Sequence, residues 1–228
     1  MGESLPAIVG PMLTVLLTRH GHTDKSEPEQ YLGQRIHATL TERGRRDAQS
    51  LRERLVGVHM DRLISSPLSR AVETAQILAS ETQVSVETDE RLSELDYGAW
   101  EGLTVEEIDR RFPDERALYE ENPAIHPVGG GESGLAVAAR LGAMLEDLLV
   151  WWQAEAEDRT CLLVGHSSVN RIFLAVVLGV PLADYRRRFK QDWASLTVLR
   201  WESVEGGPLL MLANDESHSK GTRGPTWD

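Results

Sequence analysis

The sequence predicts an α/β fold in which helices cover both faces of a mostly parallel sheet. Short apolar, β-branched runs alternate with segments of helical periodicity along most of the 228 residues, and this alternation is typical of parallel sheets. The length is ordinary for one α/β domain, and no internal repeat, low-complexity block or linker divides the chain. We therefore expect a single domain over 1–228, with its core at about 12–215.

Strands are expected where apolar and β-branched residues fall together in short runs. Cys161, the single cysteine, belongs to one of these runs, so we expect a small buried hydrophobe rather than a reactive thiol. The runs are residues 13–18, 61–65, 84–86, 160–164, 195–201 and 209–212.

Helices are expected between these strands, and several carry start signals. Ser66-Pro67 predicts an N-cap followed by proline at the first helical position. Thr104 and Glu107 fit a capping box for a helix that ends before Pro113. Residues 113–131 are rich in Pro, Gly and acids and predict a surface excursion, and 214–228 predict a flexible tail. Other helices are expected at 41–56, after 66, at 132–156 and at 167–178.

Composition narrows the classes of partner. The formal net charge of −12 repels nucleic acid and anionic membranes, so we expect neither. No run reaches the roughly 20 apolar residues of a membrane helix, and residues 1–17 lack the basic start of a signal peptide. A single cysteine suits a reducing, cytoplasmic location. The oligomeric state stays open, a homo-oligomer included.

Three residues with cationic or titratable side chains follow predicted strands or open the next helix: His20, Arg70 and His166. Ligands bind at the carboxyl ends of strands in such sheets. Phosphoryl transfer needs cations around a dianion, a neutral imidazole as nucleophile and an acid for the leaving oxygen. Arg19 would keep the adjacent imidazole neutral, and Glu94 is a candidate acid. Each residue alone has an ordinary explanation, a solvated charge or a structural histidine, but their joint placement favours a phosphoryl-transfer site.

The motifs around these residues resemble the histidine phosphatase superfamily, also called phosphoglycerate mutase-like. The resemblance spans about 12–215 and implies a three-layer α/β/α sandwich, no metal and no cofactor. It implies that His20 becomes phosphorylated, that Arg19, Arg70 and His166 bind the phosphoryl group, and that Glu94 donates a proton and then activates water. The matching segments are LLTRHGHT (16–23), SSPLSRAVETAQIL (65–78), ELDYGAWEG (94–102), GGGES (129–133) and LLVGHSSV (162–169).

The sequence departs from the mutases of that family. Ser26, Leu95 and Val105 stand where those enzymes usually carry Asn, Arg and Lys, and residues 113–131 lack their Arg pair. A substrate with two anionic groups would then be poorly held, so the resemblance favours hydrolysis of a small phosphorylated metabolite. Mutase-type transfer and a non-catalytic phospho-ligand binder are the alternatives.

Secondary assignments concern residues near the motifs. Thr23, Ser26 and Ser167 are further candidates for phosphate binding. His22 forms a His-X-His pattern with His20, but it falls in a turn without further ligands, so we expect no metal site and a role in lining the pocket or capping a loop. Other expectations are a flexible Gly129–Gly131 turn, pocket walls from Tyr97 and Trp100, and a basic cluster of Arg186–Arg188 with Lys190 that is a solvated face or binds a distal anion.

Overall fold

The computed structural model describes residues 10–154, 156–222, 224, 225 and 227. Within this part, six strands form one sheet in the order β3-β2-β4-β1-β5-β6. The first four strands run parallel, whereas β5 and β6 add an antiparallel edge, so the predicted mostly parallel sheet is confirmed. The strands are β1 (Leu13–Arg19), β2 (Arg62–Ser65), β3 (Val86–Thr88), β4 (Arg159–Gly165), β5 (Leu196–Trp201) and β6 (Pro208–Asp215).

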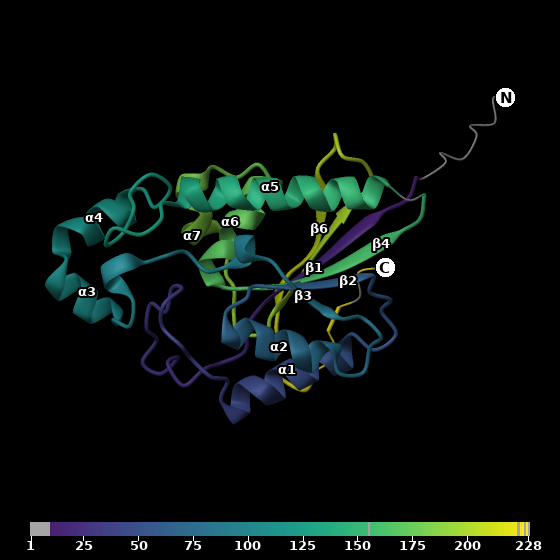
Figure 1. The fold of residues 1–228 in the computed structure, drawn as a ribbon, viewed down its shortest axis with the longest axis horizontal. Coiled ribbons are helices and arrows are strands. Elements are labelled where there is room, and N and C mark those ends of the chain that lie inside the picture. The colour runs from purple at the N-terminus through teal and green to yellow at the C-terminus, as the bar shows by residue number, and fades with distance from the viewer. Residues whose placement is uncertain (1–9, 155, 223, 226, 228) are drawn as a thin grey trace.

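Helices cover both faces of the sheet (Figure 1). One face carries α1 (Glu42–Arg54) and α2 (Ser69–Ala79), and the other carries α5 (Gly134–Gln153) and α6 (Ser167–Val177). Figure 1 places α3 and α4 beyond the carboxyl ends of the parallel strands. The remaining helices are α3 (Val105–Arg111), α4 (Pro113–Glu121), α7 (Tyr185–Arg188) and the 3₁₀ turns Glu90–Leu92, Gly98–Trp100 and Leu182–Asp184. None of the helices described is both long and apolar enough to cross a bilayer.

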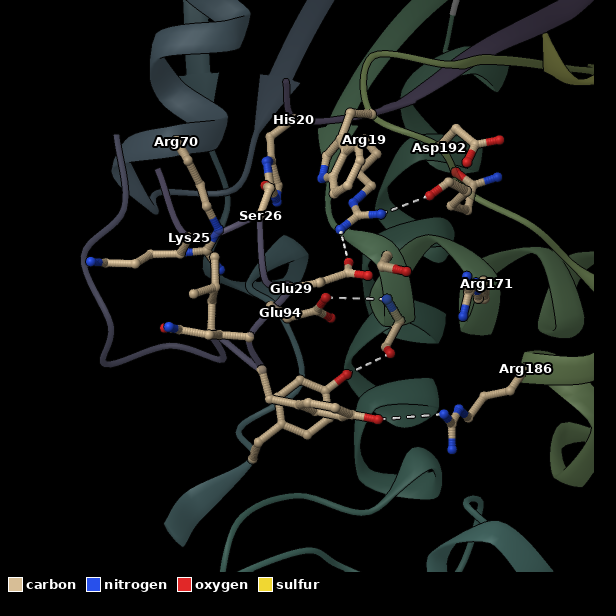
Figure 2. A pocket seen from close by; sticks show the side chains of 18 of the residues that line it. Arg19, His20, Lys25, Ser26, Glu29, Arg70, Glu94, Arg171, Arg186 and Asp192 are labelled. Carbon is tan, nitrogen blue, oxygen red and sulfur yellow. Dashed lines mark hydrogen bonds and ion pairs between the residues drawn. The ribbon is translucent and has the colours of Figure 1, made fainter. Parts of the chain in front are cut away.

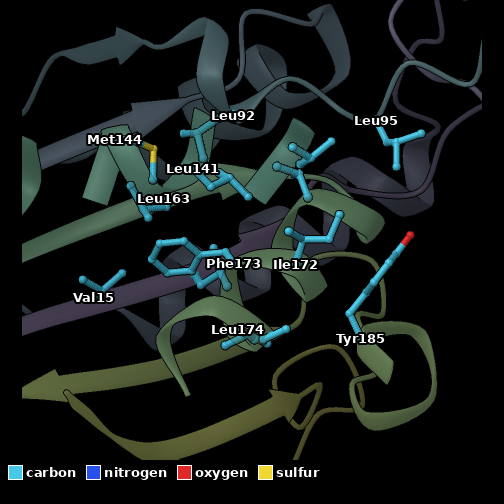
Figure 3. Packing of buried hydrophobic residues seen from close by; sticks show 14 of the residues in the cluster. Val15, Leu92, Leu95, Leu141, Met144, Leu163, Ile172, Phe173, Leu174 and Tyr185 are labelled. Carbon is cyan, nitrogen blue, oxygen red and sulfur yellow. The ribbon is translucent and has the colours of Figure 1, made fainter. Parts of the chain in front are cut away.

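Strand β1 shows why three layers form. Successive side chains of a strand point to opposite faces of the sheet. Val15 and Leu17 belong to one buried cluster with Phe173 of α6, which Figure 3 shows in part. Leu16 belongs to a second cluster with Leu51 of α1. Both faces of β1 are therefore buried, and each face has its own helical layer.

The register of the central strands brings their carboxyl ends to one edge. Arg19 of β1 pairs with Gly165 of β4, and Val164 of β4 pairs with Ser65 of β2. His20, Ser66 and His166, the residues that follow these ends, therefore lie together although far apart in the sequence.

Several local predictions need correction. Ser66 does not cap α2, which begins at Ser69 after Leu68; instead, its Oγ accepts the Leu68 N–H at 3.3 Å. The strand predicted at 84–86 lies at Val86–Thr88. The capping box at Thr104 is confirmed. The excursion at 113–131 contains helix α4, because Pro113 ends one helix and is tolerated in the first turn of the next.

The predicted flexible tail makes defined contacts in its described part. Strand β6 continues to Asp215, which lies 3.1 Å from an Arg54 guanidinium nitrogen. Arg54 also donates to the Pro225 carbonyl at 2.9 Å, and Arg200 donates to the Trp227 carbonyl at 2.6 Å. Residues 223, 226 and 228 lie outside the described residues. Asp215, Pro225 and Trp227 are thus held against the body of the protein by arginine side chains.

Candidate active site

A cavity of about 380 Å³ opens at the carboxyl edge of the parallel strands (Figure 2). Of the predicted site residues, six line it: Arg19, His20, Ser26, Arg70, Glu94 and Ser167. The lining carries more cations than acids despite the negative net charge of the chain. The cations are Arg19, Lys25, Arg70, Arg171, Arg186 and Lys190, and the acids are Glu29, Glu94 and Asp192.

His20 is buried directly after β1, and one hydrogen bond defines the tautomer of its ring. Its backbone N–H donates to the Gly165 carbonyl at 3.0 Å, which ties this turn to β4. Nδ1 lies 2.8 Å from the Gly21 carbonyl oxygen. A carbonyl only accepts, so Nδ1 carries the proton of the neutral ring and Nε2 holds the lone pair. Burial, then the charges of Arg70 and Arg19, holds the pKa of His20 well below its ordinary value.

Gly21 packs closely against the first turn of α1. A Cβ at this position would lie 2.6 Å from the Gly44 carbonyl oxygen in the first turn of α1. The converse contact is closer still, since a Cβ on Gly44 would lie 2.1 Å from the His22 carbonyl oxygen. The two glycines thus let the turn that carries His20 rest directly on α1.

Arg70 and Arg19 approach the cavity from opposite sides of His20 (Figure 2). Arg70 is buried in the first turn of α2 and donates to the Gly33 carbonyl at 2.7 Å. Burial lowers its pKa to about 10, so the guanidinium stays charged at neutral pH. Arg19 donates to the Gln191 carbonyl at 3.0 Å and to the Glu29 carboxylate at 2.8 Å. Two fixed cations therefore flank the imidazole.

His166 lies beside His20 and is not among the residues that line the cavity. The two ring centroids are 5.1 Å apart in an edge-to-face arrangement. Its Nε2 lies 2.8 Å from Ser66 Oγ, while Nδ1 is buried without a hydrogen-bond partner among the described residues. Burial and the nearby Arg70 lower the pKa of His166 well below its ordinary value. Sequence reasoning missed Ser66 as a site residue, although its place directly after β2 was a usable signal.

Glu94 is held by the first peptide groups of α6. Its Oε1 accepts the N–H groups of Leu95 at 2.9 Å and Val169 at 3.1 Å, and its Oε2 accepts that of Ser168 at 3.2 Å. The N-terminus of a helix favours a negative charge of this kind. The start of α6 therefore comes directly after His166 in the chain and also orients the carboxylate of Glu94.

The secondary candidates divide between the cavity and its supporting loop. Ser26 lines the cavity, whereas Thr23 lies outside the lining and supports Ser26 through a 3.1 Å contact between their hydroxyls. His22 contacts Thr41 Oγ1 at 3.0 Å and Glu27 at 3.2 Å. His22 therefore caps the loop, one of its two predicted roles, and does not line the cavity.

One of the two predicted wall residues is not in the wall, and the Gly129–Gly131 turn is packed against its neighbours. Tyr97 lines the cavity, but Trp100 is fully buried in the core and does not. The Gly129–Gly131 turn packs tightly rather than standing free, because a Cβ on Gly131 would lie 1.9 Å from the Asp96 carbonyl oxygen. The burial of Trp100 and the close backbone contact at Gly131 cannot be read from the sequence pattern.

Arg171 is a cavity residue that sequence reasoning missed. It lies four residues after Ser167 on α6, one helical turn along the same face. That spacing from a predicted site residue was the available signal. Arg186, considered in the sequence only as part of a basic cluster, also lines the cavity.

Comparison with known proteins places the chain in a family. The model of the histidine phosphatase superfamily (branch 1) matches residues 15–216. The chain belongs to this superfamily. Its predicted membership is thereby confirmed, and the phosphatase names of its relatives confirm its assignment to the phosphoric monoester hydrolases.

Relatives within the superfamily carry both phosphatase and mutase names. The chain is 30% identical to phosphoserine phosphatase 1 of Hydrogenobacter thermophilus, covering 84% of this chain and 88% of that protein. It is 31% identical to the probable phosphoglycerate mutase GpmB of Proteus mirabilis, covering 91% and 95%. A solved mycobacterial glucosyl-3-phosphoglycerate phosphatase in complex with inorganic phosphate superposes with a TM-score of 0.78 at 31% identity, covering 90% of this chain and 98% of that one.

Proposed function

We propose that this protein hydrolyses small phosphate monoesters through a phosphohistidine on His20, without a metal ion. The observation that carries the proposal is the neutral imidazole of His20, whose Nε2 lone pair is free and whose ring stands between Arg19 and Arg70. The cations balance the charge of the phosphoryl group and at the same time keep the nucleophile unprotonated.

In the first step, Nε2 of His20 attacks phosphorus and the bond to the ester oxygen breaks. Arg19 and Arg70 hold the phosphoryl oxygens. Glu94, acting as the acid, gives a proton to the leaving oxygen and is left as the carboxylate. The products of this step are the alcohol and a phosphorylated His20.

In the second step, the Glu94 carboxylate takes a proton from water. The resulting nucleophile attacks phosphorus, the bond to Nε2 breaks, and inorganic phosphate leaves. The hydrogen bonds from the start of α6 keep the carboxylate in place for both proton transfers.

His166 would supply a further donor to the phosphoryl group. Ser66 Oγ accepts the Leu68 N–H, so its own hydroxyl hydrogen is available to His166 Nε2 at 2.8 Å. When Ser66 donates to Nε2, the ring proton of His166 is on Nδ1, the atom without a partner in the described structure. We assign Ser66 as the positioning residue for that tautomer.

Metal independence is supported by the charges that the chain itself provides. Among the described residues, no three His, Cys, Asp or Glu side chains converge as a metal-ligand set. The guanidinium groups beside His20 occupy the place where charge develops during transfer.

The test is turnover of p-nitrophenyl phosphate and a panel of alkyl phosphates with and without EDTA. We expect equal rates in both conditions and, after a denaturing quench, protein-bound phosphate that is labile to acid and stable to base. A rate lost to EDTA and restored by a divalent cation would contradict metal independence. A folded protein that binds phosphate but turns over no ester would be a binder instead.

Mutase-type transfer is the second candidate, supported by the resemblance to the mutase GpmB. Against it, Val105 lines the cavity where mutases of the family carry Lys, and Leu95 is buried in the core where they carry Arg. A coupled assay with 3-phosphoglycerate separates the two candidates. We expect release of inorganic phosphate and no 2-phosphoglycerate.

Glu29 is expected to weaken phosphate binding. Its exposed carboxylate holds an Arg19 nitrogen at 2.8 Å and lines the cavity, so it occupies a donor that the substrate needs and repels the dianion. Glu29→Gln should lower the Ki for inorganic phosphate about 2- to 5-fold, the effect of one exposed ion pair. Glu27→Gln is the matched control, because Glu27 is equally exposed in the same loop but lies outside the cavity lining. An unchanged or raised Ki in Glu29→Gln would contradict the expectation.

A further inference from the structure

Arg171 is a largely buried cation whose guanidinium has no counterion within hydrogen-bond or ion-pair distance among the described residues. It projects from the second turn of α6 into the cavity wall (Figure 2). Among the described residues, no hydrogen bond or ion pair reaches it, and its Nε is buried without a partner. Burial and the charge of Arg19 lower its pKa.

The other arginines of the cavity all have acceptors. Arg19 is bound to Glu29 and the Gln191 carbonyl, and Arg70 is bound to the Gly33 carbonyl. The chain carries a net charge of −12, so carboxylates are plentiful, yet none pairs with Arg171 in the described structure. An unpaired buried cation is costly unless a ligand supplies the anion.

Arg186 provides a second cation on the same side of the cavity. It belongs to α7, donates to Glu120 at 2.7 Å, and has its guanidinium carbon 4.7 Å from the ring centroid of Tyr119. Its other terminal nitrogen lies 3.5 Å from the Tyr31 hydroxyl. These contacts hold the charge at a fixed place in the wall, and Glu120 itself lies outside the lining.

We propose that Arg171 and Arg186 bind a second anionic group, a carboxylate or a phosphate, carried by the alcohol part of the ester. Figure 2 shows both arginines on the α6–α7 side, apart from Arg70 on the other side of His20. The proposal rests on the proposed function, because it assumes that Arg19, His20 and Arg70 hold the reacting phosphoryl group. The preferred substrate is then a phosphate ester with a distal anion.

This subsite revises an expectation from the sequence. The missing mutase cations suggested that a substrate with two anionic groups would be poorly held. The structure supplies other cations at the cavity, from α6 and α7. The absence of those mutase residues therefore favours water as the acceptor of the phosphoryl group. It does not exclude a substrate with a second anionic group.

The test compares kcat/KM for ester pairs that differ only in the distal group. 3-Phosphoglycerate against glycerol 3-phosphate probes a carboxylate, and propane-1,3-diol bisphosphate against 3-hydroxypropyl phosphate probes a second phosphate. We expect the wild type to prefer the anionic member of at least one pair by about 10-fold or more, as for hydrogen bonds to charged groups. Arg171→Met should remove most of that ratio, and Arg171→Lys should retain part of it.

The control variant is Arg188→Ala, since Arg188 belongs to the same basic cluster but is exposed and outside the cavity lining. It should leave the ratio and both rates unchanged. Equal rates of the wild type on both members of both pairs, or an equal fall of both rates in a folded Arg171→Met, would overturn the subsite. A wild type that hydrolyses no ester would instead contradict the proposed function.

Discussion

Replacement of His20 by glutamine is expected to lower kcat for every phosphate monoester by about 10⁴-fold or more, the scale seen when a catalytic nucleophile is removed. In the proposed mechanism, Nε2 of His20 forms the covalent intermediate, and no other side chain in the cavity lining is a neutral imidazole. The measurement is steady-state turnover together with acid-labile phosphate on the protein after rapid quench. Both signals should disappear together.

His22→Gln is the control for this result. His22 is two residues away and buried, but it contacts Thr41 and Glu27 rather than the cavity. This variant should keep the phosphorylated intermediate even if its loop is less stable. Glutamine at position 20 keeps a polar side chain of similar length, so a folded protein is expected by circular dichroism. Persistent turnover in His20→Gln would sink the phosphohistidine mechanism.

Glu94→Gln is expected to separate the two chemical steps. Loss of a general acid costs roughly 10²- to 10⁴-fold, and the loss should be greatest for alkyl phosphates, whose leaving oxygen needs a proton. p-Nitrophenyl phosphate leaves as a stable anion, so its first step should be much less affected. The second step still lacks its base. A burst of nitrophenolate equal to the enzyme concentration should therefore precede a slow steady state, with phosphorylated His20 accumulating.

The control is Glu42→Gln, because Glu42 is exposed on α1 and pairs only with Arg46 in the described structure. It should show wild-type turnover and no burst. Equal losses with alkyl and p-nitrophenyl phosphates, without an accumulating phosphoenzyme, would show that Glu94 supports the site without moving protons. In that case the hydrogen bonds to Ser168 and Val169 would be its main contribution.

The sheet and its main helices could be predicted from local pattern alone. The strand at 13–18 and the helix at 167–178 have a periodicity that places apolar side chains toward a core, and their ends matched β1 and α6 within about two residues. A weaker local signal, a predicted helix start, led to a wrong prediction. Ser66-Pro67 resembles a helix start, but the serine follows β2 directly and contacts His166 instead.

Chain order and motif spacing were enough to nominate His20, Arg70, Glu94 and His166 as one group. Residues that follow parallel strands or open the next helix share an edge of the sheet. His20, Arg70 and His166 are three such residues, and their joint occurrence with a candidate acid is improbable as coincidence. The roles of these residues in the reaction remain our proposal, which the variants above test.

The sequence by itself therefore determined the α/β architecture, the family and the edge of the sheet where the candidate residues gather. Only the tertiary structure decided which hydrogen bond leaves Nε2 of His20 free, that Gly21 packs against α1, and that Arg171 lines the cavity without a paired carboxylate among the described residues. The physical reason is the distance along the chain between the residues that determine each property. Periodicity and strand order follow from neighbours along the chain, whereas burial, charge pairing and tautomer depend on atoms that distant segments bring together.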